Sequence, residues 1–373
     1  MSGATIAPSL PAMREHFADV GNVELWVRLV LTIPALFIVI GSPIAGTIVD
    51  RLGRKPLLVA CLLLYGLAGS SGFFLNSLFA ILLGRAFLGL AVAGIMVGAT
   101  TLIADYYVGA ARATFMGLQA AFMGLGGVLF LSGGGFLADA NWRLPFLIYL
   151  FAWLLLPMAI LFVYEPHPQV AQTNQPEQTE ASSQLPIKLL ILVFSSAVIT
   201  QIIFYLIPVQ LPFYLQKLSN ATATQSGLAI AFATLFSAFS SLSYGKLKQR
   251  LDFLGILTLS FILIGVGYFG LGLASNYSQV LMTLVPIGLG LGVLMPNLNV
   301  WVSATVPDTL RGRALGGLTT FFFLGQFLSP IVSQTISQQI GLATTYSLAG
   351  VILIILALIF LLMKRQINRL VMS

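Results

Sequence analysis

One densely charged short stretch of the chain is GTIVDRLGRK, residues 46–55, whose charged members are Asp50, Arg51, Arg54 and Lys55. Long apolar runs lie on both sides of it, at 27–49 and 57–75. A carboxylate and three cations can form ion pairs with neighbouring segments, and a carboxylate also binds the positive N-terminus of a helix. The stretch is therefore a candidate for electrostatic contacts at the boundary of an apolar phase.

The composition shows which apolar phase this is. The 373 residues are 58% hydrophobic and only 8% charged, whereas soluble domains carry about 25% charged residues. About 20 apolar residues are needed for a helix to cross a bilayer. By that rule the chain is an all-α integral membrane protein with eleven predicted spans, at 27–49, 57–75, 79–104, 113–137, 144–164, 187–215, 224–245, 254–275, 279–305, 312–339 and 342–363.

The N-terminal stretch MSGATIAPSLPAM is apolar but short. As a helix it would reach only about 20 Å, too little to span, and it lacks the basic region of a signal peptide. We expect it to be the last part of a twelfth helix whose beginning is missing. The alternative is a short re-entrant or surface segment.

A polar stretch divides the chain into two halves. Residues 165–186 are rich in Gln, Pro, Ser and Thr and have no apolar periodicity, which predicts a linker. The predicted domains are therefore a six-helix bundle at 1–164 and a second at 187–373. Residues 111–126 and 312–326 also resemble each other, and two related halves are typical of secondary transporters, with the binding site at the bilayer midplane.

The basic residues predict the orientation, because Lys and Arg concentrate in cytoplasmic loops. With an even number of spans, the predicted outer loops hold only Arg14, Arg28, Arg143 and Lys217. The inner segments hold thirteen of the eighteen basic residues: Arg51, Arg54, Lys55, Arg112, Lys188, Lys246, Lys248, Arg250, Arg311, Arg313, Lys364, Arg365 and Arg369. We therefore expect both termini and the linker to be cytoplasmic, in the plasma (inner) membrane.

Four motifs carry a resemblance to a known family. They are G-x-x-x-D-R-x-G-R-K at 46–55, RAFLGLAVAG at 85–94, WRLPF at 142–146 and RGRA at 311–314. Together they resemble the major facilitator superfamily (MFS), and in particular its drug/proton antiporter-like efflux permeases. The resemblance implies the MFS fold of twelve helices. It also implies a cytoplasmic latch, in which Asp50 lies at the start of the eleventh helix. The residues of this latch are Gly46, Asp50, Arg51, Gly53, Arg54, Lys55 and Asp105.

Glycines in the fourth and fifth spans are candidates for close helix packing. Gly89 and Gly94 belong to the fourth-span motif. The fifth span resembles an antiporter pattern, G-x8-G-x3-G-P-x2-G-G, which Gly117, Gly126, Gly134 and Gly135 match. Phe130 and Leu131 stand where that pattern has Gly-Pro, so the pattern is half present.

Polar residues inside predicted spans are candidates for the substrate cavity. Arg85 is the only basic residue away from the ends of a predicted span, and the alternative is that it extends to the outer surface. The resemblance implies that spans one, four, seven and ten line the cavity. The cavity candidates are Arg85, Gln201, Tyr205, Asn297 and Gln326, and the alternative for the neutral ones is helix–helix hydrogen bonding.

Other function classes lack their motifs. The chain has no G-x-x-x-x-G-K-[ST] loop and no catalytic signature, and His16 and His167 have no second metal ligand nearby. We expect no enzyme activity, cofactor, metal or nucleic acid, and a monomer whose partners are the bilayer, a small-molecule substrate and protons. Proton-driven efflux of small apolar or amphipathic compounds is the leading function. Uptake, facilitated diffusion and a non-transporting relative stay as alternatives, because the only acid available for proton coupling is Asp105, which lies at the end of the fourth span and is already assigned to the latch.

Overall fold

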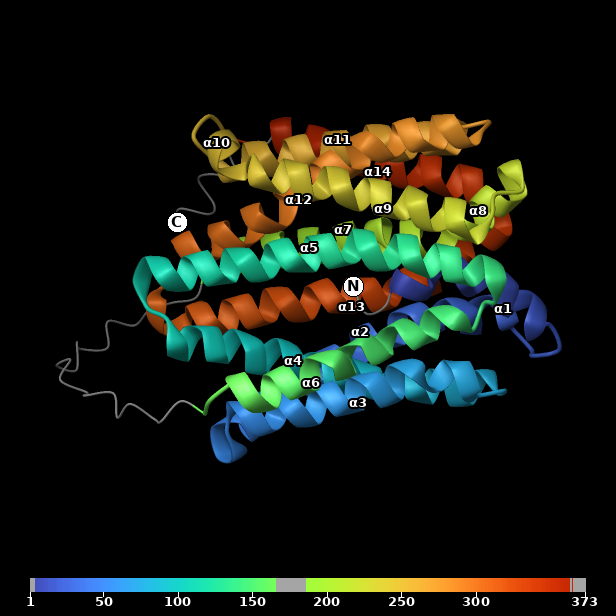
Figure 1. The fold of residues 1–373 in the computed structure, drawn as a ribbon. Coiled ribbons are helices and arrows are strands. Elements are labelled where there is room, and N and C mark those ends of the chain that lie inside the picture. The colour runs from blue at the N-terminus through green and yellow to red at the C-terminus, as the bar shows by residue number, and fades with distance from the viewer. Residues whose placement is uncertain (1–3, 166–185, 363, 365–373) are drawn as a thin grey trace.

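The computed structural model describes residues 4–165, 186–362 and 364, and these residues form helices and connecting turns (Figure 1). Eleven helical segments in the described part of the chain are long and apolar enough to cross a membrane. They coincide with the eleven predicted spans to within a few residues at each end. The prediction of an all-helical membrane protein is confirmed.

The helices before residue 165 form the N-terminal half. Long, mostly apolar runs explain the length of the spanning helices, since every backbone polar group must be bonded within its own helix in lipid. Their bounds are η1 Ala4–Ser9, α1 Leu10–His16, α2 Val23–Leu52, α3 Arg54–Phe74, α4 Leu78–Tyr106, α5 Gly109–Ala140, η2 Leu144–Leu150 and α6 Phe151–Phe162.

The helices after residue 186 form the C-terminal half. Asp252 and Asn276 each begin a helix by accepting a hydrogen bond from a first-turn backbone N–H. The bounds are α7 Ile187–Phe204, α8 Leu206–Ser219, α9 Ala223–Leu242, α10 Tyr244–Lys248, α11 Phe253–Leu273, α12 Tyr277–Thr305, α13 Asp308–Ile340 and α14 Leu342–Leu362.

One predicted span is broken in two. The span at 187–215 is interrupted at Tyr205, between α7 and α8. Pro208 has no N–H for the carbonyl of Phe204, and its ring crowds that carbonyl. The hydroxyl of Tyr268 on α11 compensates by donating to the Ile203 carbonyl at 2.6 Å and to the Phe204 carbonyl at 3.3 Å. The break is thus stabilised from a neighbouring helix.

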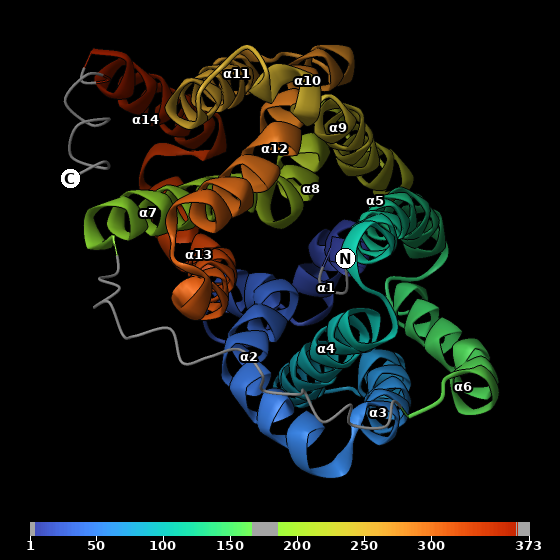
Figure 2. The ribbon, with the colours of Figure 1, turned by 90° about the vertical axis from the view of Figure 1, so that its left-hand side faces the viewer.

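The short N-terminal segment lies in the middle of the molecule (Figure 2). Residues 4–10 are buried without exception. They pack against α5 of their own half and against α8 and α9 of the other half. The segment is therefore an interior element, and a surface segment is excluded for residues 4–10.

The most extensive packing between the halves, among the described residues, is that of α5 with α9 and of α2 with α13. Most other close packing lies within one half, for example α2 with α4 and α11 with α14. We name the end of the bundle at Leu52 and Ile187 the linker end, and the end at His16 and Ser219 the opposite end (Figure 1). The division into two independent domains stays a prediction.

Candidate transport path and its two ends

At the linker end, the predicted latch residues form contacts inside one half. The Arg54 Nε donates to Asp105 Oδ2 at 2.8 Å, and this ion pair connects α3 to α4. The Lys55 ammonium donates to the Ile160 carbonyl of α6 at 2.7 Å. Gly53 turns the chain between α2 and α3 with φ +95°, a conformation that suits glycine.

A residue that the sequence analysis assigned to the linker completes this cluster. Glu165 reaches the start of α3, where its two carboxylate oxygens accept from the backbone N–H groups of Arg54 and Lys55, each at 2.7 Å. This is a carboxylate cap on a helix N-terminus, where the helix dipole favours negative charge. A Cβ at Gly53 would overlap Glu165, so the glycine also makes room for the cap.

Asp50 differs from its neighbours. It lies in the last turn of α2, and both Asp50 and Arg51 are exposed. Among the residues that the structure describes, no ion pair or hydrogen bond of the Asp50 carboxylate is present. Gly46 has open space around it. A contact between Asp50 and the start of α13 stays a prediction.

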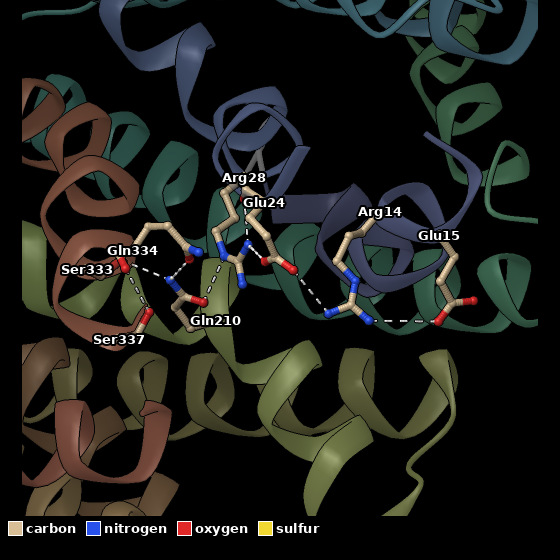
Figure 3. Close-up of polar contacts among 8 residues, drawn as sticks. All are labelled: Arg14, Glu15, Glu24, Arg28, Gln210, Ser333, Gln334 and Ser337. Atoms are coloured by element: carbon tan, nitrogen blue, oxygen red, sulfur yellow. Dashed lines mark hydrogen bonds and ion pairs between the residues drawn. The ribbon is translucent and has the colours of Figure 1, made fainter. Parts of the chain in front are cut away.

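The opposite end contains a polar network that connects the two halves (Figure 3). Arg28 on α2 donates from Nε to Gln210 on α8 at 2.9 Å. Gln210 in turn donates to Ser333 at 3.1 Å and to Gln334 at 3.4 Å, both on α13. Glu24 forms ion pairs with Arg28 and with Arg14.

Arg28 is a correction to the sequence analysis, which placed it in an outer loop. The side chain is only 4% exposed, and its guanidinium carbon lies 4.1 Å from the centre of the Phe213 ring. Helix α2 begins at Val23, four residues before the predicted span. Arg28 is the second residue of the predicted span and was counted with the outer loop, because sequence composition does not show that folding buries this charge beside its partners.

A second contact between the halves lies at the same end. Asp139 on α5 accepts from the backbone N–H groups of Ala223 at 2.7 Å and Thr224 at 3.1 Å. These groups start α9, so an acid of one half caps a helix of the other. Next to it, a Cβ on Gly135 would lie 2.7 Å from the Ala223 carbonyl and 3.2 Å from Gly227 Cα. The two helices therefore touch backbone to backbone.

The predicted packing glycines have different surroundings. A Cβ at Gly89 would lie 2.5 Å from the Pro34 carbonyl of α2, and a Cβ at Gly94 would overlap Cys61 of α3. Gly134 lies in the same way against Thr5 of η1. Among the described residues, Gly117 has no atom within 4 Å of such a Cβ, and Gly126 has only Phe130 of its own helix. For Gly117 and Gly126 a packing role stays a prediction.

Arg85 and Tyr205, two predicted cavity residues from different halves, lie in the same interior region. Arg85 is 1% exposed, and its Nε donates to the Val30 carbonyl at 3.0 Å. Its guanidinium lies over the Tyr149 ring at 5.2 Å, and Tyr205 is within electrostatic range of both Arg85 and Tyr149. Arg85 is thus held in the interior and does not extend to the surface.

The other three cavity candidates are also buried. Asn297 donates to the Phe253 carbonyl of α11 at 2.9 Å, so in this structure its amide connects two helices of one half, the alternative that the sequence left open. Gln201 is 3% exposed, and its Oε1 has no hydrogen-bond partner among the described residues. Gln326 is 5% exposed. Substrate contact by these residues stays a prediction.

Two cavities lie between the halves, and none of the five predicted cavity residues lines either one. The first, about 540 Å³, is at the opposite end and is lined by Arg14, Glu24, Arg28, Phe213, Gln216, Lys217, Gln334, Ser337, Gln338 and Leu342. The second, about 340 Å³, lies in the linker-end parts of α2, α4 and α13 and is lined by Ile38, Val39, Ser42, Met96, Val97, Thr100, Thr101, Gly316, Thr319, Thr320 and Phe323. The second lining is apolar with hydroxyls and has no charged side chain.

A helical membrane bundle with cavities between two halves is the architecture of a secondary transporter. The family model of the Major Facilitator Superfamily matches residues 1–277 and, separately, residues 193–369. The chain belongs to this family. It is a multi-pass integral membrane protein and a transporter, not an enzyme, which confirms the family resemblance of the sequence motifs.

Particular relatives are distant but match nearly the whole chain. The quinolone resistance protein NorA of Staphylococcus aureus (strain MRSA252) is 23% identical over 357 residues, covering 93% of this chain and 91% of NorA. The class H tetracycline resistance protein of Pasteurella multocida is 25% identical over 339 residues, covering 88% of this chain and 83% of that protein.

Solved structures agree on the fold. A D-xylose-proton symporter superposes with a TM-score of 0.81 at 15% identity, covering 96% of this chain and 93% of that one. A POT family transporter in complex with a thioalcohol conjugated peptide gives 0.80 at 13% identity, covering 98% and 94%. At such identity the likeness concerns the fold alone.

Proposed function

We propose that the protein is a proton-coupled exporter of small apolar or amphipathic compounds, working by alternating access as a monomer. The observation that carries the proposal is the linker-end cavity. Its apolar and hydroxyl lining suits a substrate with little charge, and it lies between α2 and α4 of one half and α13 of the other. The distant similarity to two drug resistance proteins supports the same substrate class.

The orientation proposed from the basic residues places the linker end in the cytoplasm of the cell, at the plasma membrane. The contacts between the halves at the opposite end, through Arg28, Gln210 and Asp139, then describe a state closed to the outside. Export would break these contacts and form the latch of Asp50 at the linker end. In that second state the Asp50 carboxylate binds the positive start of α13, which begins at Asp308.

Glu24 is our candidate for the coupling group. It lies outside the predicted span at 27–49, but in the structure it is in the first turn of α2 and forms an ion pair with the buried Arg28. Protonation of this carboxylate would remove its attraction for Arg28 and weaken the contacts between the halves.

Everted membrane vesicles test the proposal, with ethidium as the probe and an imposed proton gradient as the driving force. We expect gradient-dependent ethidium accumulation that a protonophore abolishes. We also expect the Glu24→Gln variant to lose the gradient dependence, whereas Asp19→Asn, a change at an exposed acid between α1 and α2, retains it. Accumulation in wild-type vesicles that ignores the protonophore would contradict proton coupling. Proton-dependent accumulation only in right-side-out vesicles would identify an uptake system.

A further inference from the structure

The cavity at the opposite end has the features of a binding site for an organic anion. Of its charged lining residues, Arg14, Arg28 and Lys217 are cations and Glu24 is an acid. The Glu15 carboxylate lies 4.0 Å from the Arg14 guanidinium, next to the cavity lining, and is counted as a second carboxylate. The group therefore carries one uncompensated positive charge, which is what a single carboxylate would neutralise.

Arg28 supplies the donor that a ligand would use. Its Nε and Nη1 are occupied by Gln210 and Glu24. Its second terminal nitrogen, Nη2, has no acceptor among the residues that the structure describes, and Figure 3 shows it without a dashed line to any residue drawn. Nη2 is not among the buried unbonded atoms of the described residues, and Arg28 lines the cavity, so this donor is open to an acceptor that enters the cavity.

The rest of the lining suits an amphipathic molecule. Phe213 and Leu342 provide apolar surface, and Gln334, Ser337 and Gln338 provide neutral polar groups on α13. Few converging polar groups in a partly apolar cavity are typical of small-molecule sites. A volume of about 540 Å³ accommodates a two-ring molecule.

We infer that this cavity binds the carboxylate of a small aromatic acid, with Arg28 Nη2 as its principal donor. The ligand touches α2 of one half and α8 and α13 of the other, so it occupies the outer part of the path between the halves. The assignment deepens the proposed export function and relies on it for the direction of transport. Binding itself requires no transport, so the two can be tested separately.

The test compares 2-naphthoate with 2-naphthamide, which share one ring system and differ in charge. Binding of each to the purified full-length chain in neutral detergent is measured by calorimetry. We expect wild-type protein to prefer naphthoate by about ten-fold or more, the contribution of one charge-assisted hydrogen bond in a partly buried site. Arg28→Gln should abolish the preference, and Arg28→Lys should retain part of it.

Arg143→Gln is the matched control. Arg143 lies at the same end of the molecule and bonds to Phe73 and Asn76, but it does not line the cavity. Its substitution should leave the preference unchanged. If Arg28→Gln does not fold, Gln210→Glu replaces it, because a carboxylate of nearly the same shape beside Arg28 should also remove the preference.

Three results would overturn the inference. They are equal wild-type affinity for the two probes, an unchanged preference in folded Arg28→Gln, and loss of naphthoate binding when phosphatidylglycerol is added, which would assign the site to a lipid headgroup. Ethidium export that fails while the naphthoate preference persists would contradict the proposed function and leave this site in place. A purely structural role of Arg28 predicts lower stability with no change in the ratio of the two affinities.

Discussion

The two ends of the bundle use similar residues for different purposes. At the linker end, Glu165 caps α3 and Arg54 pairs with Asp105, and both contacts stay within the N-terminal half. At the opposite end, Asp139 caps α9 and Arg28 bonds Gln210, and both contacts cross between the halves. Contacts within a half persist when the halves move against each other, whereas contacts between them must break. The comparison therefore separates residues that build the halves from residues that set their relative position.

The largest expected effect is at the backbone contact between the halves. Gly135→Val places a side chain against the Ala223 carbonyl and Gly227, and such overpacking costs about 1–3 kcal/mol. We expect the opposite end to open, measured as faster thiol labelling of a cysteine introduced at Ser337. Gly117→Val is the control, since nothing lies within 4 Å of a Cβ there. Equal labelling of the two variants would contradict this account of the interface.

The Glu165 cap should have a local effect. Glu165→Ala removes two hydrogen bonds at the start of α3, and loss of a cap costs about 0.5–2 kcal/mol. Hydrogen exchange at the Arg54 and Lys55 amides should become faster. Thiol labelling at the opposite end should not change, because the contact lies within one half. A change there would mean that the two ends are coupled through this cap.

Loss of the Asp139 cap, unlike loss of the Glu165 cap, should also affect the contact between the halves. Asp139→Ala is expected to cost about 1 kcal/mol, but only in the state in which α5 and α9 meet at this end. Exchange at the Ala223 and Thr224 amides should become faster, and labelling at the opposite end should rise as well. Asp139→Asn keeps one acceptor oxygen and should have a smaller effect. Faster exchange without a rise in labelling would make Asp139 a local cap like Glu165.

The smallest effect is expected for the latch residue that is exposed in this structure. Asp50→Asn removes a charge whose interaction with a helix start is about 0.3–1 kcal/mol. The contact forms only in the other state, so the stability of the present state should not change. Ethidium export should slow a few-fold at unchanged protein level, as measured in the vesicle assay. Full export activity would show that Asp50 has no latch function.

Sequence reasoning recovered the spans because continuous apolar runs leave few alternatives in lipid. It missed residues at the boundaries. Glu24 was left outside the predicted span, Arg28 was counted with the outer loop because it lies at the start of that span, and Glu165 was read as linker because it begins a polar stretch. Their roles depend on partners 182 residues away in one case and 111 in another, which local patterns do not contain.

For residues inside the spans, sequence reasoning identified the polar side chains but could not tell what they contact. Asn297 is polar and lies in the tenth span, one of those that the family resemblance implies to line the cavity. Its amide, however, bonds to the Phe253 carbonyl on α11. Which face of a helix meets the cavity depends on the rotation of that helix, and hydrophobic periodicity is weak when all sides are apolar. The residues that do line the linker-end cavity, such as Ser42 and Thr319, are small hydroxyls that no motif distinguishes.

The glycine contact between α5 and α9 has a consequence for how often the halves can separate and rejoin. Long side chains that interlock must each be frozen into one rotamer when a surface closes, at up to about 2 kcal/mol apiece. Gly135 and Gly227 have no rotamers to lose. Closing the contact between α5 and α9 therefore costs little side-chain conformational entropy, and opening it regains little. The hydrogen bonds of the few capped N–H groups then determine whether this contact between α5 and α9 is closed or open.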